Sequence, residues 1–147
     1  MTDRLRAVFD TNVFVSALLS RNPTSPTQEL MDRWHNDEFT LVVCDALVDE
    51  VIEKLTERQI NQEDILELTA LFDHLAEWVD VPPEAVSPAV QADPDDDVIL
   101  ACAILGETDY LVTYDPHFEP LGGEYKGVKI TKALPFLWAV RGDRPPT

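Results

Sequence analysis

The stretch "DPDDDVILACA", Asp93–Ala103, decides the fold because it joins a cluster of aspartates directly to an apolar run. The segment Val98–Leu105 is apolar on every side of a helix, which is typical of a buried helix. Asp97 lies in the first turn of this expected helix, so its carboxylate cannot swing freely into solvent. Two carboxylates about 4 Å apart repel by roughly 4 kcal/mol at an effective dielectric constant near 20. Something must offset that repulsion.

Short apolar strands alternate with helices along the rest of the chain. The predicted strands are 6–9, 39–43, 77–81, 110–114 and 127–130. The predicted helices include 13–18, 46–55, 96–105 and 132–140. This alternation predicts an α/β fold, an α/β/α sandwich with a central, mostly parallel sheet of about five strands and helices on both faces. We expect residues 1–147 to form a single domain.

Several predicted helices begin at residues suited to cap them. Ser25 is an expected cap, Pro26 suits the first helical position, and Gln28 completes a capping box. Asp45 and Asp95 are the expected caps of two later helices, because aspartate accepts hydrogen bonds from amides of the first turn.

The chain is strongly acidic, with 28 acidic residues against 11 basic ones and a net charge of −17. Such a charge opposes nucleic acid at long range, and it also suits a protein that works in high salt. The basic residues of the two chain ends are Arg4, Arg6, Lys126, Lys129, Lys132, Arg141 and Arg144. They form either a basic rim for nucleic acid or an ordinary solvated surface.

The two cysteines and the lack of a long apolar segment in the sequence indicate in which compartment the protein is expected. Cys44 and Cys102 each lie in an apolar run, so two buried thiols are favoured over a disulfide. No Cys or His spacing indicates a zinc site. No signal-peptide or membrane-helix pattern is present, and we expect a soluble cytoplasmic protein with no membrane association.

Acidic residues occur where parallel strands end. Asp10 ends the first strand and Asp115 follows the fourth, and ligands of open parallel sheets bind at this edge. Asp97 approaches from a helix start, and Glu50 borders the apolar side of its helix. Such oxygen-rich clusters suit Mg²⁺ or Mn²⁺ rather than zinc. Local roles stay open for each residue: a helix-dipole acid, an Asx turn, a turn acid, or a solvated helix face for Glu50.

Four segments in order resemble the PIN domain family, in particular the toxins of toxin–antitoxin pairs. They are "VFDTNVFVSALLS", "LVVCDALVDEVIEKL", "DPDDDVILACA" and "DYLVTYDPHF". The resemblance implies an acidic quartet that binds metal, with two supporting polar residues: Asp10, Glu50, Asp97 and Asp115, then Asn12 and Thr113. One departure is Tyr114, which stands where the family often has glycine and could narrow the approach to the metal.

The same resemblance implies an activity and partners. We expect a metal-dependent endoribonuclease in which Mg²⁺ or Mn²⁺ activates a water that attacks an RNA phosphodiester bond, leaving a 3′ hydroxyl and a 5′ phosphate. The implied partners are an RNA substrate, an antitoxin protein and a second copy of the chain in a homodimer.

Two alternatives to a nuclease are open. A PIN scaffold could bind RNA or protein without cleaving anything. A receiver-type phosphoacceptor domain also clusters aspartates around Mg²⁺, but it needs an acidic pair after the first strand. Here Asp10 is followed by Thr11 and Asn12.

Overall fold

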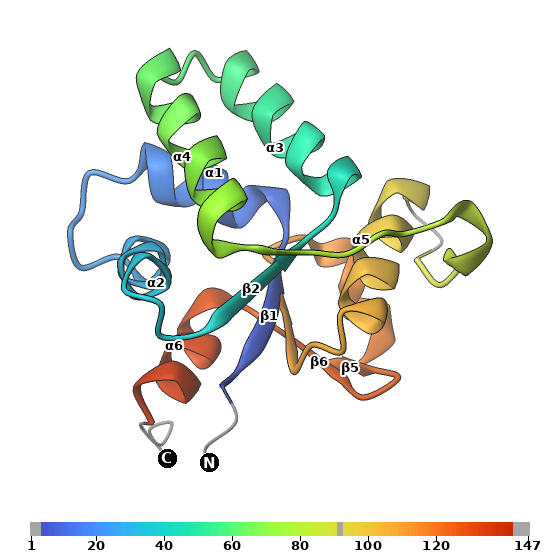
Figure 1. Ribbon diagram of the computed structural model, residues 1–147. Helices are drawn as coiled ribbons and strands as arrows, with labels where there is room; N and C mark the ends of the chain where they lie inside the picture. The colour runs from blue at the N-terminus through green and yellow to red at the C-terminus, as the bar shows by residue number, and fades with distance from the viewer. Residues whose placement is uncertain (1–3, 91–92, 143–147) are drawn as a thin grey trace.

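The structure is a computed structural model that describes residues 4–90 and 93–142 (Figure 1). The strands are β1 Arg6–Phe9, β2 Thr40–Val43, β3 Glu77–Trp78, β4 Tyr110–Val112, β5 Glu124–Tyr125 and β6 Val128–Thr131. The helices are α1 Thr11–Leu19, α2 Pro26–His35, α3 Asp45–Glu57, α4 Gln62–Leu75, α5 Pro94–Leu105 and α6 Ala133–Arg141, with short 3₁₀ helices η1 Pro83–Ala85 and η2 Pro116–Leu121.

The strands form one six-stranded sheet in the order β3-β2-β1-β4-β6-β5. All neighbouring strands are parallel except β5, which runs antiparallel to β6. This confirms the predicted α/β fold with a mostly parallel sheet. The sequence did not predict β5, because a strand of two residues is too short to show an alternating pattern.

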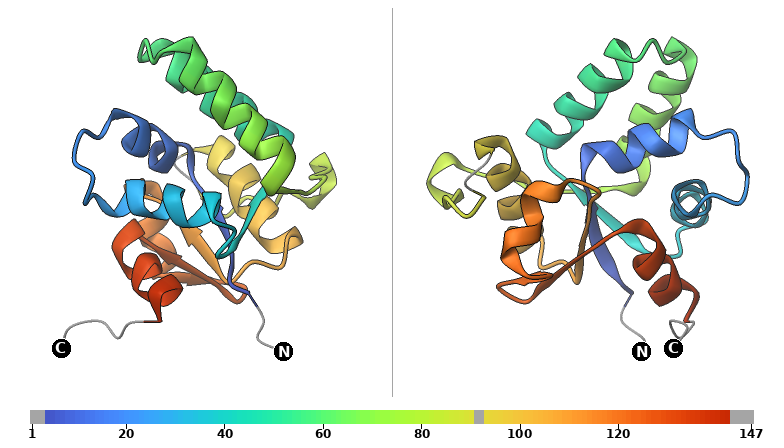
Figure 2. Two further views of the ribbon diagram at one scale, coloured as in Figure 1. Left: turned by 60° about the vertical axis from the view of Figure 1, so that its left-hand side comes forward. Right: turned by 180° about the vertical axis from the view of Figure 1, so that it is seen from behind.

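Helices cover both faces of the sheet (Figures 1 and 2). Helix α5 packs on β1, β2 and β4 from one side, whereas α2 lies against α1, α4 and α6 on the other. Helices α3 and α4 form a hairpin that extends beyond the sheet, and α3 packs on α1. Because α3 follows β2 directly, its first turns lie at the carboxyl edge of the sheet.

An aromatic cluster anchors β1 to the helices that cover it. The ring of Phe9 lies 5.8 Å from Phe14, 5.6 Å from Phe39 and 5.7 Å from Phe136 between centroids. All four side chains are buried. Tilted or edge-to-face pairs of this kind contribute about 0.5–1.5 kcal/mol each beyond burial of their area. The cluster therefore holds the end of β1 rigidly, immediately before Asp10.

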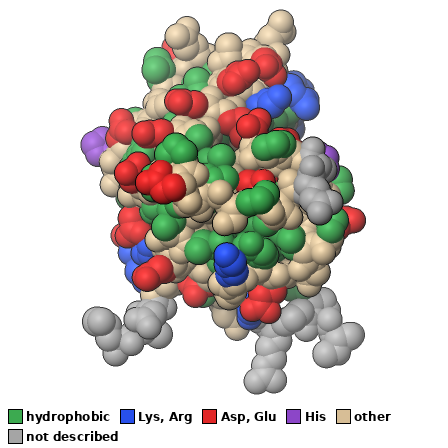
Figure 3. Space-filling view, turned by 90° about the vertical axis from the view of Figure 1, so that its right-hand side faces the viewer, with side chains coloured by type: hydrophobic (Ala, Val, Ile, Leu, Met, Phe, Trp, Pro, Cys, Tyr) green, Lys and Arg blue, Asp and Glu red, His purple; other side chains and the backbone are tan. Residues whose placement is uncertain are grey.

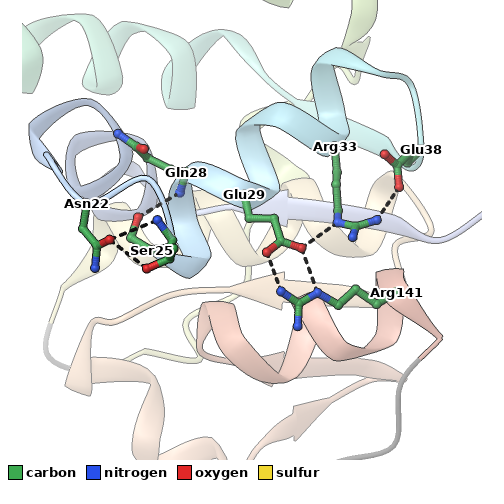
Figure 4. Close-up of polar contacts among 8 residues, drawn as sticks. Asn22, Ser25, Gln28, Glu29, Arg33, Glu38 and Arg141 are labelled. Carbon is green, nitrogen blue, oxygen red and sulfur yellow. Dashed lines mark hydrogen bonds and ion pairs between the residues drawn. The ribbon is translucent and has the colours of Figure 1, made fainter.

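Ion pairs join α2 to α6 at the surface (Figure 4). The carboxylate of Glu29 accepts from Nε of Arg141 at 2.7 Å and from Nε of Arg33 at 2.8 Å. These hydrogen bonds, with Arg141 the stronger cause, lower the pKa of Glu29 to about 2. Glu29 thus connects a helix near the start of the chain to the last one.

The helix starts follow the predictions in part. Ser25 caps α2 by accepting from the backbone N of Gln28 at 3.2 Å, as expected. The second half of the capping box is wrong, because the Gln28 side chain donates to the carbonyl of Ser20 at 2.7 Å instead. Asp45 is also not a cap: α3 begins there, and Cys44 precedes it without a side-chain cap bond.

The start of α5 lies earlier than predicted. Asp93 caps it by accepting from the backbone N of Asp95 at 3.0 Å, so Asp95 is inside the helix. The physical reason is Pro94, which has no amide hydrogen to lose and a φ angle preset for the first helical position. Asp95, Asp96 and Asp97 therefore each lie two positions further into the helix than predicted.

The two cysteines are buried free thiols, as predicted. Cys44 is 2% exposed and Cys102 is 0% exposed. Within residues 4–90 and 93–142, no helix combines the length and apolar character that a membrane crossing requires.

Candidate metal centre

Asp10 lies at the carboxyl end of β1 with only 4% of its surface exposed. Its Oδ1 accepts from the backbone N of Thr11 at 2.8 Å, which caps α1. Its Oδ2 accepts from Oγ1 of Thr113 at 2.7 Å. Burial raises the pKa of Asp10, the two hydrogen bonds oppose this effect, and the charge of Asp115 adds to it. This carboxylate is thus held in place and poorly solvated, as suits a ligand for a cation.

Thr113 links two of the predicted acids. Its hydroxyl donates to Asp10 and also accepts from the backbone N of Asp115 at 2.9 Å. The strands explain this arrangement, because Phe9 of β1 is in register with Val112 of β4. The residues that follow these two therefore lie side by side at the edge of the sheet. Asp115 then caps η2 by accepting from the backbone N of His117 at 2.9 Å.

The aspartate of α5 that joins this group is Asp96. One carboxylate oxygen from each of Asp10, Asp96 and Asp115 can be chosen so that all lie within 4.8 Å of one another. Asp96 is 7% exposed. Burial first, and then the charge of Asp115, raise the pKa of Asp96 to about 7, against the hydrogen bond from His117. The proton and a metal ion would therefore compete for this carboxylate.

Asp97, the residue chosen from the sequence, lies elsewhere. Its Oδ1 accepts from the backbone N of Ala89 at 2.9 Å and of Val90 at 2.6 Å. It is 6% exposed and lines a different, smaller depression beside Leu100 and Tyr125. Asp97 is thus engaged in fastening the connection before α5 and does not join the cluster of Asp10 and Asp115. Consecutive helical residues point about 100° apart, so Asp96 and Asp97 face different surroundings: Asp96 faces the cleft and Asp97 faces the connection before α5.

The remaining predicted residues surround the cluster. Glu50 lines the same cleft from α3, and burial and the charge of Asp10 raise its pKa. Asn12 also lines the cleft, and its Oδ1 accepts from the backbone N of Tyr114 at 3.3 Å. Tyr114 lines a neighbouring depression with Thr131 and is not among the residues of the acidic cleft. The expected narrowing by Tyr114 is therefore not seen.

The cleft has a volume of about 550 Å³ and is open to solvent. Its acidic lining residues are Asp10, Glu50, Glu57, Asp93, Asp96 and Asp115, and its basic ones are Lys54 and Arg58. Lys54 lies on α3 one turn after Glu50, and Arg58 caps the carboxyl end of this helix one turn further on. Figure 3, which views the right-hand side of Figure 1, shows acidic side chains spread over most of this face, with basic side chains at its upper right and in its lower part.

The basic residues singled out from the sequence do not line this cleft in the part of the chain that is described. Three arginines form ion pairs: Arg4 with Asp37, Arg6 with Glu77, and Arg141 with Glu29. Lys126 and Lys129 lie over the rings of Tyr125 and Tyr110. Arg144 lies outside the described residues.

The donor atoms fit a hard divalent cation. Ligands bound at about 2.1 Å around an octahedral ion lie about 3–4 Å apart. The distances between the three carboxylate oxygens are at most 4.8 Å, which is slightly more than in a coordinated set, and a bound ion would draw the oxygens together. An all-oxygen set of this kind suits Mg²⁺ or Mn²⁺.

A second group overlaps the first. Asp93, Asp96 and His117 also offer ligand atoms that lie within 4.8 Å of one another. The sequence patterns did not indicate either Asp96 or His117 as a candidate ligand. The signal for Asp96 was Pro94, which marks the first turn of α5, whereas the side chain of His117 reaches the site only because η2 turns back toward α5.

Comparisons with known proteins agree with this architecture. A PIN domain model matches residues 6–117, which include both Asp10 and Asp115. Among solved structures, the fold is similar to VapBC2 from Rickettsia felis, which was crystallised with a DNA fragment from its promoter. That match has 15% identity and a TM-score of 0.57, and it covers 86% of this chain and 97% of the other. No curated protein matches the chain.

Proposed function

Because the chain belongs to the PIN domain family, we propose that it is a metal-dependent endoribonuclease that hydrolyses RNA phosphodiester bonds. The observation that carries this proposal is the convergence of Asp10, Asp96 and Asp115 from three separate elements on one open cleft. Their mutual repulsion and burial are costly unless a cation occupies the space between them.

The chain's own residues have distinct roles in this proposal. Asp10, Asp96 and Asp115 hold Mg²⁺ or Mn²⁺, with Asp96 in place of Asp97. Glu50, which lines the same cleft from α3, completes the predicted quartet with Asp96 in place of Asp97. When bound, the cation supplies a Lewis acid that activates water and offsets the growing charge of the phosphate.

Two polar side chains and two basic side chains support the acidic residues. Thr113 orients Asp10 through its 2.7 Å hydrogen bond, so that one carboxylate oxygen stays fixed. Asn12 ties the start of α1 to the end of β4 through the backbone of Tyr114. Lys54 and Arg58 stand where they can contact a phosphate beside the one that is cleaved, which offsets the net charge of −17 locally.

The proposed partners follow from the same family. VapBC2, which the fold resembles, is a toxin–antitoxin pair by name. We propose that this chain is likewise the toxin of such a pair and that an antitoxin protein inhibits it. Its assembly as a homodimer stays a prediction, which sedimentation of the purified chain can check.

The direct test is digestion of RNA by the purified protein with Mn²⁺, with Mg²⁺ and with EDTA. We expect cleavage only with metal, products with 5′ phosphate and 3′ hydroxyl ends, and no cleavage by D96N. Cleavage that persists in EDTA, or equally in D96N, would indicate a contaminating nuclease. Metal-dependent RNA binding without cleavage would instead support the non-catalytic scaffold, and labelling by acetyl phosphate would support a phosphoacceptor.

A further inference from the structure

We propose that His117 is a metal ligand that, with Asp93 and Asp96, holds a second cation beside the position formed by Asp10, Asp96 and Asp115. Asp96 belongs to both groups. This inference rests on the proposed function, because it concerns the same candidate metal centre. Metal binding and RNA cleavage are nevertheless measured separately.

The distances around His117 suit a ligand. Its Nδ1 lies 3.2 Å from Oδ2 of Asp96 and 3.3 Å from Oδ1 of Asp115. Neighbouring ligands on one octahedral ion are about 3 Å apart when each bond is about 2.1 Å. The His117 nitrogen and the Asp96 oxygen are therefore already spaced as neighbouring cation ligands are, and Asp93 offers an oxygen within 4.8 Å of the ligand atoms of both residues.

Backbone contacts position His117 beside Asp115. The amide of His117 donates to Oδ1 of Asp115 at 2.9 Å, and Pro116 begins η2, so the first turn after β4 is rigid. The His117 side chain remains 43% exposed, which leaves ions from solvent free access to it. Asp93 is fixed as the cap of α5, where one of its oxygens accepts from the amide of Asp95.

The chemistry of the two positions differs. Imidazole nitrogen is a common ligand of transition-metal ions, whereas carboxylate oxygens suit Mg²⁺ and Mn²⁺ alike. The position with His117 should therefore be less favourable for Mg²⁺ than the all-oxygen position, which accepts either ion. If both positions were occupied, Asp93, Asp96 and His117 would hold one cation next to the one held by Asp10, Asp96 and Asp115, and the added positive charge would favour a bound phosphate.

A competing interpretation is that His117 is only a cationic partner of the carboxylates. The two interpretations predict opposite effects of H117A on metal binding. If His117 is a ligand, its removal weakens the binding of Mn²⁺. If His117 is only a competing positive charge, its removal strengthens Mn²⁺ binding, because the carboxylates no longer interact with that charge.

The test is titration of the tag-free, full-length protein with Mn²⁺, followed by electron paramagnetic resonance. We expect two bound Mn²⁺ ions in the wild type and ¹⁴N modulation from a coordinated imidazole in pulsed spectra. In H117A the ¹⁴N signal disappears and the second ion binds at least about tenfold more weakly. The matched control is H74A, since His74 lies on α4, is exposed and is absent from both ligand groups; it should bind as the wild type does.

The results that would overturn the inference are equally specific. They are a wild-type spectrum without ¹⁴N modulation, or a Mn²⁺ affinity in H117A that equals or exceeds that of the wild type. Because no RNA is present, a protein that binds Mn²⁺ through His117 but cleaves nothing would refute the proposed nuclease and leave this site standing. Cleavage without a ¹⁴N signal would do the reverse.

Discussion

Thr113 and Asp10, separated by 103 positions in the chain, are joined by a hydrogen bond of 2.7 Å from Oγ1 to Oδ2. The bond favours the ionised form of a carboxylate whose pKa is raised by burial. T113V keeps the shape of the side chain and removes the donor. We expect weaker Mn²⁺ binding at neutral pH and a loss of about 1–3 kcal/mol in the free energy of unfolding.

Isothermal titration with Mn²⁺ and thermal unfolding in EDTA check this prediction. T131V is the matched control, because Oγ1 of Thr131 is buried without a hydrogen-bond partner among the described residues. That substitution should leave stability unchanged or raise it. Equal effects of the two variants would mean that the Thr113 hydrogen bond contributes neither to stability nor to Mn²⁺ binding.

Substitutions of the two neighbouring aspartates should separate metal binding from loop anchoring. D96N removes a charge from the carboxylate cluster, so we expect Mn²⁺ binding to be lost while the protein stays folded. D97N weakens the acceptor of the Ala89 and Val90 amides, so we expect lower stability with Mn²⁺ binding retained. Loss of binding in D97N alone would restore the assignment made from the sequence.

The stability of the metal-free protein should fall as the pH rises from 5 to 7. Burial and the charge of Asp115 raise the pKa of Asp96 from 3.8 to about 7, so the folded state holds a proton that the unfolded state has released. The stabilisation is complete below pH 3.8 and is lost as the pH approaches 7. The raised pKa values of Asp10 and Glu50 act in the same direction.

The measurement is the melting temperature in EDTA at several pH values. In D96N the decline should be smaller, because the substituted side chain does not titrate. Carboxyls with lowered pKa values, such as Glu29 and Glu77, titrate below this range and should not mask the effect. An identical pH dependence in both proteins would contradict the assignment to Asp96.

The two basic residues of the cleft, Lys54 of α3 and the adjoining Arg58, should contribute to RNA binding without contributing to metal binding. Lys54 and Arg58 line the acidic cleft, and each can neutralise one phosphate. For K54A/R58A we expect weaker RNA binding and a shallower salt dependence, by about 1–1.5 in the logarithmic slope. Mn²⁺ affinity should stay close to that of the wild type or increase.

Fluorescence anisotropy with labelled RNA at several salt concentrations measures this effect. K126A/K129A is the control with the same change of charge, since these lysines lie over tyrosine rings and do not line the cleft. If the control weakens binding as much as K54A/R58A, the RNA path lies elsewhere or the effect is only one of net charge.

Gly106 ends α5 at a point where the helix lies close to β2. A Cβ added there would lie 2.6 Å from Cγ1 of Val42, although the backbone φ angle of −78° is acceptable for alanine. We therefore expect G106A to destabilise the protein by about 1–3 kcal/mol through overpacking. In the V42A background the cost of G106A should be smaller, and denaturant unfolding of all four proteins measures the coupling. Additive effects would contradict the proposed clash.

Local sequence patterns determined the α/β class and most of its elements. The apolar segments became strands in parallel order, and the acids at the ends of the first and fourth strands lie together as predicted, because parallel strands present their carboxyl ends at one edge. These features depend on contacts near in the chain and on general rules of strand connection, so residue types and spacing are sufficient to predict them.

Only the tertiary structure decided which aspartate of α5 lies beside Asp10 and Asp115. Asp95, Asp96 and Asp97 are chemically identical, and the choice depends on the helix start at Pro94 and on the amides of Ala89 and Val90, which take up Asp97. The same holds for His117, which η2 carries back over Asp96, and for Lys54 and Arg58, which α3 brings to the cleft. Rotation of a helix about its axis and the path of a turn are decided by packing between distant segments, which the identity of the residues alone does not reveal.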